Sequence, residues 1–184
     1  YAVWSSVESF LLPGALYEAV RFLEAHSEHG ACQGYSISYD AGVDHVDYML
    51  RDLKVLDDHD VGDQQARVER FMAQSVSLQH AVTRTALLRN WFAALAAWMS
   101  LHWQEVGLGF YLNCAARVQV LPLPYALHLV DEQVQSRHEA AVRGAVLHVD
   151  PKARKEREAC IAIVLKALGE SVGQAADAIA AGFQ

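Results

Sequence analysis

The sequence predicts an all-α protein: an antiparallel helical bundle, either ferritin-like or irregular and orthogonal, around one buried tryptophan-rich helix. Three observations support this. Residues 90–104 hold three of the four tryptophans and no formal charge, so a helix there would be buried on nearly all sides. Apolar residues recur at helical spacing in most other segments. The chain has only four prolines and an alanine-rich second half, which favours helices over a β-sandwich.

The first half predicts three helices and one loop. Leu16, Val20 and Leu23 predict a helix over 15–26, after a break at Pro13-Gly14. Residues 30–43 lose the helical pattern, and their tyrosines alternate with serines at a period of two. Because an isolated strand has no partner in a helical protein, we expect an extended loop there. Helices over 43–57 and about 68–82 follow, with these inner faces: Val46, Met49, Leu50, Leu53 and Leu56; Val68, Phe71, Met72, Ser75, Leu78, Gln79 and Val82.

The second half predicts the central helix over 85–106, interrupted or bent at Gly107 and Gly109. A short helix over 111–120 ends before Pro122 and Pro124, which cannot both lie inside a helix. Further helices are expected over 124–147, from the N-cap pair Asp150-Pro151 to Leu168, and from Ser171 to about Ala181. No linker divides the chain, so residues 1–184 are expected to form one domain.

Charge and composition exclude several classes of protein. A formal charge of −7 and a basic cluster interleaved with glutamates over 152–158 argue against nucleic acid as a partner. The uncharged run over 90–104 is shorter than the roughly 20 residues of a membrane-spanning helix. Three distant cysteines form no Cys-x-x-Cys pair, and no signal peptide is visible. We therefore expect a cytoplasmic protein that does not enter a membrane.

One metal hypothesis uses residues a helical turn apart. The Glu-x-x-His spacing of di-iron bundles is absent, so an intrinsic di-iron centre is not expected. The reversed spacing joins His102 to Glu105, and His128 to Glu132. These four could converge from two helices, although folding back near Pro122 offsets the histidines by about 20 Å. The alternative is a buried, hydrogen-bonded His102 and a His128 that pairs locally with a carboxylate.

A second metal hypothesis starts from the doublet His59-Asp60. It resembles the His-Asp doublet of the HD phosphohydrolases, which would imply a divalent ion that activates water for phosphoester attack. His29 and His80 would then be outlying ligands, with Asp131 completing the set. The alternative is an acidic, solvated turn between helices. A polar group at the end of the first helix has the same two interpretations, as a divalent-ion site or as a polar terminus: Glu24, His26, Glu28 and His29.

The aromatic residues of the central helix have two interpretations: they belong to the hydrophobic core, or they line a ligand pocket. Tryptophans at helical spacing are most simply core, and the same side chains together with one histidine could line a pocket for an apolar ligand. The candidate pocket residues are Trp91, Trp98, His102 and Trp103.

Residues 98–160 resemble the hydroxylase β subunit of the soluble di-iron multicomponent monooxygenases. The matching features are Trp98-Met99, the Gly107-Leu-Gly109 turn, LHLVDEQV around His128 and Asp131, His148-Val-Asp150-Pro, and the polar run Arg154–Cys160. The resemblance implies a ferritin-like subunit that carries no iron and supports a catalytic partner. The first 90 residues do not take part in it, and it implies no catalytic residue.

Together these observations predict a non-catalytic helical binding or assembly module in a homo- or hetero-oligomer. The resemblance implies that this module is a scaffold subunit of an oxygenase complex. Two alternatives stand beside it: an HD-type metal-dependent phosphohydrolase, and a helical domain that binds an apolar small ligand between tryptophans and histidine. No cofactor can be named from the sequence.

Overall fold

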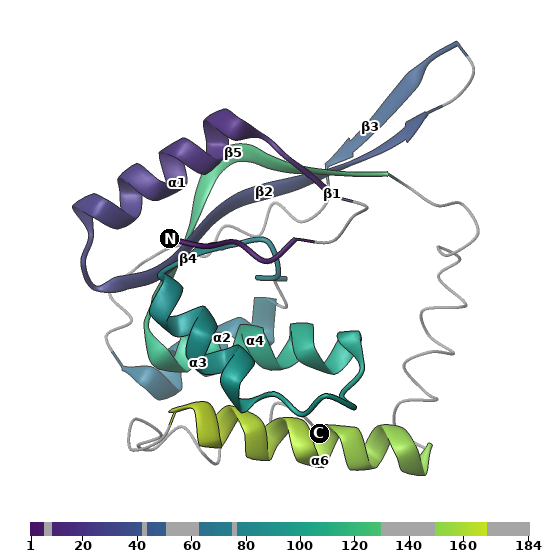
Figure 1. Ribbon diagram of the computed structural model, residues 1–184. Coiled ribbons are helices and arrows are strands. Elements are labelled where there is room, and N and C mark those ends of the chain that lie inside the picture. Colours follow the sequence, from purple (N-terminus) through teal and green to yellow (C-terminus); the bar gives the residue numbers. More distant parts are fainter. Residues whose placement is uncertain (6–8, 42–43, 51–62, 75–76, 130–149, 169–184) are drawn as a thin grey trace.

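The fold is mixed α/β, so the predicted all-α bundle is wrong. The computed structural model describes residues 1–5, 9–41, 44–50, 63–74, 77–129 and 150–168. In this part of the chain a five-stranded sheet separates helix α1 (Pro13–Ala25) from a second layer of helices (Figure 1). That layer contains α2 (Gln64–Gln74), α3 (Thr85–Ala94) and α4 (Leu101–Ala115), and α6 (Pro151–Leu168) packs beyond it. Both layers of helices bury apolar side chains against the sheet.

Two long strands form the middle of the sheet. β2 (His29–Ala41) and β5 (Arg117–Leu129) run parallel to each other, and the strand order is β1-β5-β2-β3. β1 (Ser9–Leu11) pairs antiparallel with β5, and β3 (Val46–Leu50) pairs antiparallel with β2. The two-residue strand β4 (Val82–Thr83) also pairs with β2. The topology therefore brings residues near the start of the chain next to residues near 128.

The predicted loop over 30–43 and the predicted helix over 43–57 are both corrected. Residues 29–41 form β2 and residues 46–50 form β3, and these strands pair as a hairpin. The period-two pattern of Tyr35, Ile37 and Tyr39 was a true strand signal. The sequence conceals its partners, because the segments that form β3 and β5 both carry apolar residues at helical spacing. The rest of the predicted helix, 51–57, lies outside the described residues.

Strand β5 replaces the end of one predicted helix and the start of another. Helix α4 continues to Ala115, and then residues 117–129 are extended. Pro122 and Pro124 are exposed within this strand. They are tolerated because β1 pairs only with residues 126–128, and because the β2–β5 register shifts between Gln33 and Tyr35. Residues 130–147 and 171–181 of the other predicted helices lie outside the described part.

The predicted helix over 15–26 is confirmed as α1, apart from its start. It begins at Pro13 instead of Ala15, since proline at the first helical position sacrifices no hydrogen bond. Its inner residues are fully or almost fully buried against Cys32, Val82, Tyr125 and Ala126 of the sheet: Ala15, Ala19 and Leu23. The small alanines let the helix approach the sheet closely.

The predicted central helix over 85–106 is split into α3 and α4, with irregular chain over 95–100. The reason lies in tertiary packing around Gly107. A methyl group there would lie 2.6 Å from Trp91 and 2.6 Å from Cys160 Sγ of α6. In one continuous helix, residues 91 and 107 would lie about 24 Å apart, so the chain must fold back for them to meet. Gly109 similarly leaves room for the Phe71 ring of α2, and neither glycine ends α4.

Helix α6 begins as predicted. The Asp150 side chain accepts a hydrogen bond from the Ala153 backbone N–H at 2.9 Å, as an N-cap does. Its buried Glu156 accepts a hydrogen bond of 2.6 Å from Ser100, which ties the α3–α4 connection to α6. In the residues that the structure describes, no helix is both long and apolar enough to cross a bilayer.

Candidate functional site

The predicted aromatic pocket divides between core and surface. Trp91 is fully buried and stacks on Tyr111 with ring centroids 5.7 Å apart, and Trp103 is also buried. Trp98 is 55% exposed in the α3–α4 connection, and His102 is exposed beside the Trp103 ring. Two of the four candidates therefore belong to the core, and the other two lie outside it.

The first metal hypothesis places its residues on different layers. His102 and Glu105 belong to α4, whereas His128 belongs to β5 and packs against His80. Burial raises the pKa of the half-buried Glu105 carboxyl. Among the described residues, no three His, Cys, Asp or Glu side chains are grouped so that they could hold a metal ion. Glu132 lies outside the described residues.

The second metal hypothesis cannot be followed to its centre, because His59, Asp60 and Asp131 also lie outside the described part. Its proposed outlying ligands are both described, and each has different neighbours. His29 lies beside the rings of Phe22 and His26, whereas His80 lies beside His128. The HD-type hypothesis therefore stays a prediction.

A cluster that the sequence did not reveal joins Ser9, His80 and His128. The Ser9 hydroxyl lies 3.1 Å from Nε2 of His80 and 2.9 Å from Nδ1 of His128. The two imidazole rings have centroids 5.1 Å apart and are tilted by 35°. Because a hydroxyl has one hydrogen, it donates to one of these nitrogens and accepts from the other. We call these three residues the Ser9 cluster.

Strand pairing and one tyrosine position the Ser9 cluster. Ser9 of β1 and His128 of β5 lie directly opposite each other in the antiparallel ladder. His80 comes from the turn before β4, where its backbone carbonyl accepts a 2.8 Å hydrogen bond from the buried Tyr125 hydroxyl. On the other side of β5, Ser38 of β2 lies opposite His128. The Ser38 hydroxyl is buried and has no hydrogen-bond partner within the described residues, which costs about 1–3 kcal/mol.

Burial sets the protonation state of His80. Loss of hydration, and secondarily the neighbouring His128, lower the pKa of His80 to about 4. At neutral pH its imidazole is therefore uncharged and keeps a lone pair. A general base works best with a pKa near the working pH, so His80 is a weak proton acceptor for activating Ser9 as a nucleophile. The cluster is better suited to binding through nitrogen and oxygen lone pairs.

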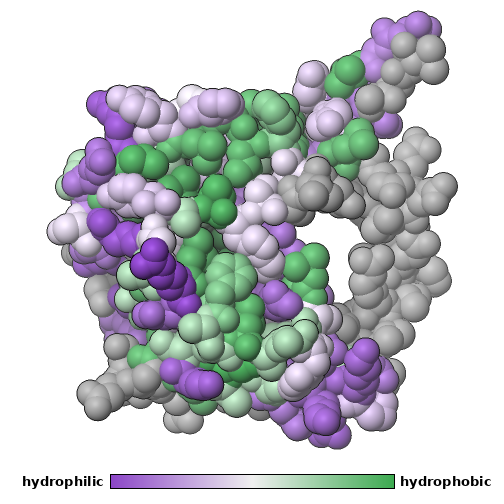
Figure 2. All heavy atoms as spheres, in the orientation of Figure 1, coloured by the Kyte–Doolittle hydropathy of each residue, from purple (hydrophilic) through white to green (hydrophobic). Residues whose placement is uncertain are grey.

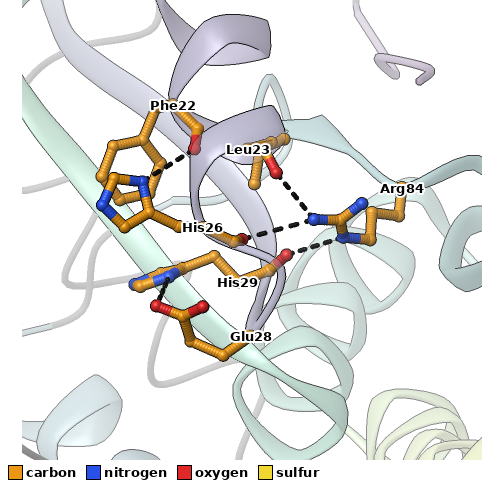
Figure 3. A network of polar contacts seen from close by, with 6 residues as sticks. All are labelled: Phe22, Leu23, His26, Glu28, His29 and Arg84. Atoms are coloured by element: carbon orange, nitrogen blue, oxygen red, sulfur yellow. Dashed lines mark hydrogen bonds and ion pairs between the residues drawn. The ribbon is translucent and has the colours of Figure 1, made fainter.

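A second histidine cluster lies at the end of α1 and has a structural role (Figure 3). The Arg84 guanidinium donates to the backbone carbonyls of Leu23 at 2.7 Å, His26 at 3.3 Å and His29 at 2.8 Å. The His26 ring stacks on Phe22 with centroids 4.1 Å apart, and its Nδ1 lies 2.8 Å from the Phe22 carbonyl. Nδ1 of His29 lies 3.3 Å from the Glu28 carboxylate.

This arrangement caps a helix. A cation at a helix C-terminus satisfies carbonyls that have no partner within the helix and interacts favourably with the helix dipole. The polar group that the sequence placed at this helix end is thus held by Arg84, a residue that carried no signal in the sequence.

Comparison of the chain with models of protein families and with curated proteins finds no match. The resemblance to the hydroxylase β subunit is therefore not supported by any relative, and β5 lies where a ferritin-like subunit needs a helix around His128. The inference of function rests on the geometry of this chain alone.

Sequence reasoning treated His80 and His128 separately and missed Ser9 entirely. Ser9 and His128 are 119 positions apart, and only the β1–β5 register joins them. Only the recognition of residues 117–129 as a strand that pairs with residues 9–11 would have placed Ser9 opposite His128.

Proposed function

We propose that this protein is an assembly module that pairs with a second copy of itself through strand β3. The observation that carries the proposal is the β2–β3 hairpin, which extends past the rest of the sheet (Figure 1). In the described part of the chain, β3 lies at the end of the sheet and pairs only with β2. Such an edge strand offers backbone groups to another strand.

The hairpin has two chemically different faces. Tyr39 and Tyr48 lie opposite each other in its register, and so do Asp40 and Asp47. Because side chains alternate along a strand, the tyrosine pair lies on one face and the aspartate pair on the other. Tyr48 is 65% exposed and Val46, two residues earlier, is 46% exposed. Hydrophilic residues gather towards the hairpin tip (Figure 2).

This hairpin needs further stabilisation. The described pairing of β2 with β5 ends at Tyr39, so only the Asp40–Asp47 and Ala41–Val46 pairs lie beyond it as a two-stranded ribbon. Such a ribbon is marginal in water, and like charges directly opposite each other destabilise it further. A further strand beside β3 would pack a side chain against Tyr48, which removes apolar surface from water, and would supply backbone partners along this edge. The hairpin therefore gains stability from a partner strand.

A second copy fits this edge in one symmetric register. If two β3 strands pair antiparallel about a two-fold axis at Tyr48, Asp47 lies opposite Met49 of the other copy and no aspartates face each other. The tyrosines then form one row across four strands, Tyr39 and Tyr48 of each copy. Aromatic cross-strand pairs of this kind are favourable. A five-residue strand pair is smaller than a standard interface, so we expect a weak dimer with micromolar affinity.

The test is a charge exchange at Tyr48. Tyr48→Asp and Tyr48→Lys each place like charges together at the two-fold axis, so each variant alone should sediment as a monomer. An equimolar mixture should recover dimers, because Asp then faces Lys. Sedimentation velocity from about 5 to 200 µM, a range that spans a micromolar dissociation constant, measures this.

Tyr17→Asp is the matched control, since Tyr17 is 63% exposed on α1 away from the hairpin. It should leave the wild-type dimer unchanged. A wild-type protein that stays monomeric over the whole range, or variants that fail to recover dimers on mixing, would overturn the proposal.

A further inference from the structure

The Ser9 cluster has the dimensions of a metal site. In a tetrahedral Zn²⁺ site with bonds of about 2.1 Å, neighbouring ligand atoms lie roughly 3.4 Å apart, and the centroids of two imidazole ligands lie about 5 Å apart. In this structure the Ser9 oxygen lies 3.1 and 2.9 Å from the two imidazole nitrogens, and the ring centroids are 5.1 Å apart. Both N···O distances are shorter than the separation of zinc ligands by roughly 0.3–0.5 Å, so rotations of the three side chains would have to widen the cluster slightly to admit an ion.

The chemistry of the three groups selects the class of ion. Neutral imidazole nitrogen suits Zn²⁺ and the divalent ions of cobalt, nickel and copper, whereas Ca²⁺ and Mg²⁺ prefer sites made of oxygen ligands. A histidine nitrogen must be deprotonated to bind a metal, and the Nε2 of His80 and Nδ1 of His128 both lie within 3.1 Å of the Ser9 hydroxyl oxygen.

We propose that Ser9, His80 and His128 bind one divalent transition-metal ion of the Zn²⁺ class, with His80 Nε2 and His128 Nδ1 as the principal ligands and the Ser9 hydroxyl as a weaker third. A tetrahedral ion would keep its fourth position for water or another ligand. Such an ion would tie β1, β5 and the turn before β4 together. The proposal does not depend on assembly through β3.

Cobalt(II) is the probe for this site, because tetrahedral Co²⁺ absorbs visible light far more strongly than octahedral Co²⁺ in water. Titration of the full chain with Co²⁺ should give an intense visible band that saturates at one equivalent, and Zn²⁺ should abolish it. His128→Gln should weaken binding by at least about tenfold, because loss of a group that merely orients a metal ligand already costs about 10–100-fold. Ser9→Ala should weaken it by less.

His102→Gln is the matched control, since His102 is an exposed histidine on α4. It should leave the titration unchanged. The proposal is overturned if no saturable band forms, if His128→Gln binds as well as the wild type, or if His102→Gln weakens binding equally.

A measurement on the unaltered protein covers the case in which His128→Gln fails to fold. Histidine-selective NMR spectra recorded with and without one equivalent of Zn²⁺ should show shifts in the ring signals of His80 and His128. The signals of His26, His29 and His102 should stay in place. Ring signals of His80 and His128 that do not respond to Zn²⁺ would overturn the proposal.

Discussion

The described residues include two histidine clusters, and the surroundings of each cluster give it different properties. At the end of α1, His26 contacts the Phe22 carbonyl and ring, and the Glu28 carboxylate lies beside His29. In the Ser9 cluster, two nitrogens from distant parts of the chain point at one hydroxyl. Proximity of histidines is therefore not enough to define a site. What matters is whether the ring nitrogens are used by the local backbone or converge on a common point.

The largest expected effect concerns the first cluster. Arg84→Ala removes a charged donor from three backbone carbonyls, so we expect a loss of about 3 kcal/mol in the free energy of unfolding. Arg84→Lys should recover only part, because an ammonium group lacks the planar fork of guanidinium. Urea denaturation measures both. Arg21→Ala is the control: its pair with Glu18 is exposed, and its loss should be near zero. An equal effect of both alanine variants would refute the capping role.

The second prediction concerns acid and the Ser9 cluster. The pKa of His80 is lowered in the folded state to about 4, so the unfolded chain binds more protons between about pH 6.5 and pH 4. This contribution to stability is present above pH 6.5 and is lost as the pH falls towards 4, by no more than about 3 kcal/mol in total. The difference between wild type and His80→Gln in urea denaturation isolates it from the titration of carboxylates. Parallel pH profiles of the two proteins would contradict this assignment.

The third prediction concerns the Ser9 hydroxyl, which contacts both imidazoles of the Ser9 cluster. Ser9→Ala leaves two imidazole nitrogens without the hydroxyl between them, so we expect a loss of about 1–2 kcal/mol. Ser27→Ala, in the exposed turn after α1, should change stability by less than about 0.5 kcal/mol. Thermal denaturation at pH 7 compares the two. If the two variants melt alike, the hydroxyl does not link the histidines.

The smallest expected effect returns to the first cluster. His26→Ala removes the contact of the imidazole with the Phe22 carbonyl and its stacking on the Phe22 ring. We expect the free energy of unfolding to fall by about 1 kcal/mol. This loss of stability should be smaller than that of Arg84→Ala, because the Arg84 guanidinium donates to three backbone carbonyls at the helix end. A larger loss in His26→Ala, measured by urea denaturation, would assign the cap to the histidine.

Local features of the sequence predicted local structure correctly. The stripe of α1 and the Asp150 N-cap of α6 depend on residues within a few turns of one helix, and both helices are present. The pairing of β2 with β5 was not predicted because the two strands are distant in the sequence: Ala31 and its partner Val118 are 87 positions apart (118 − 31). The Ser9 cluster was not predicted for the same reason, since Ser9 and His128 are 119 positions apart. Helical patterns in residues 46–50 and 124–129 were outweighed by pairing that no local pattern reveals.

The most direct test of the account is a disulfide between positions 9 and 128. Directly opposite residues in an antiparallel pair have Cα atoms about 4.5–5.5 Å apart, within reach of a disulfide. The native Cys32, Cys114 and Cys160 are buried, and burial raises the pKa of each thiol to about 12, so they should react slowly. Mild oxidation of the double variant Ser9→Cys with His128→Cys should form the bond nearly completely. The one-residue slip Phe10→Cys with His128→Cys should not, because its side chains lie on opposite faces. No bond in the first variant, or equal bonds in both, would contradict the β1–β5 register and the Ser9 cluster with it.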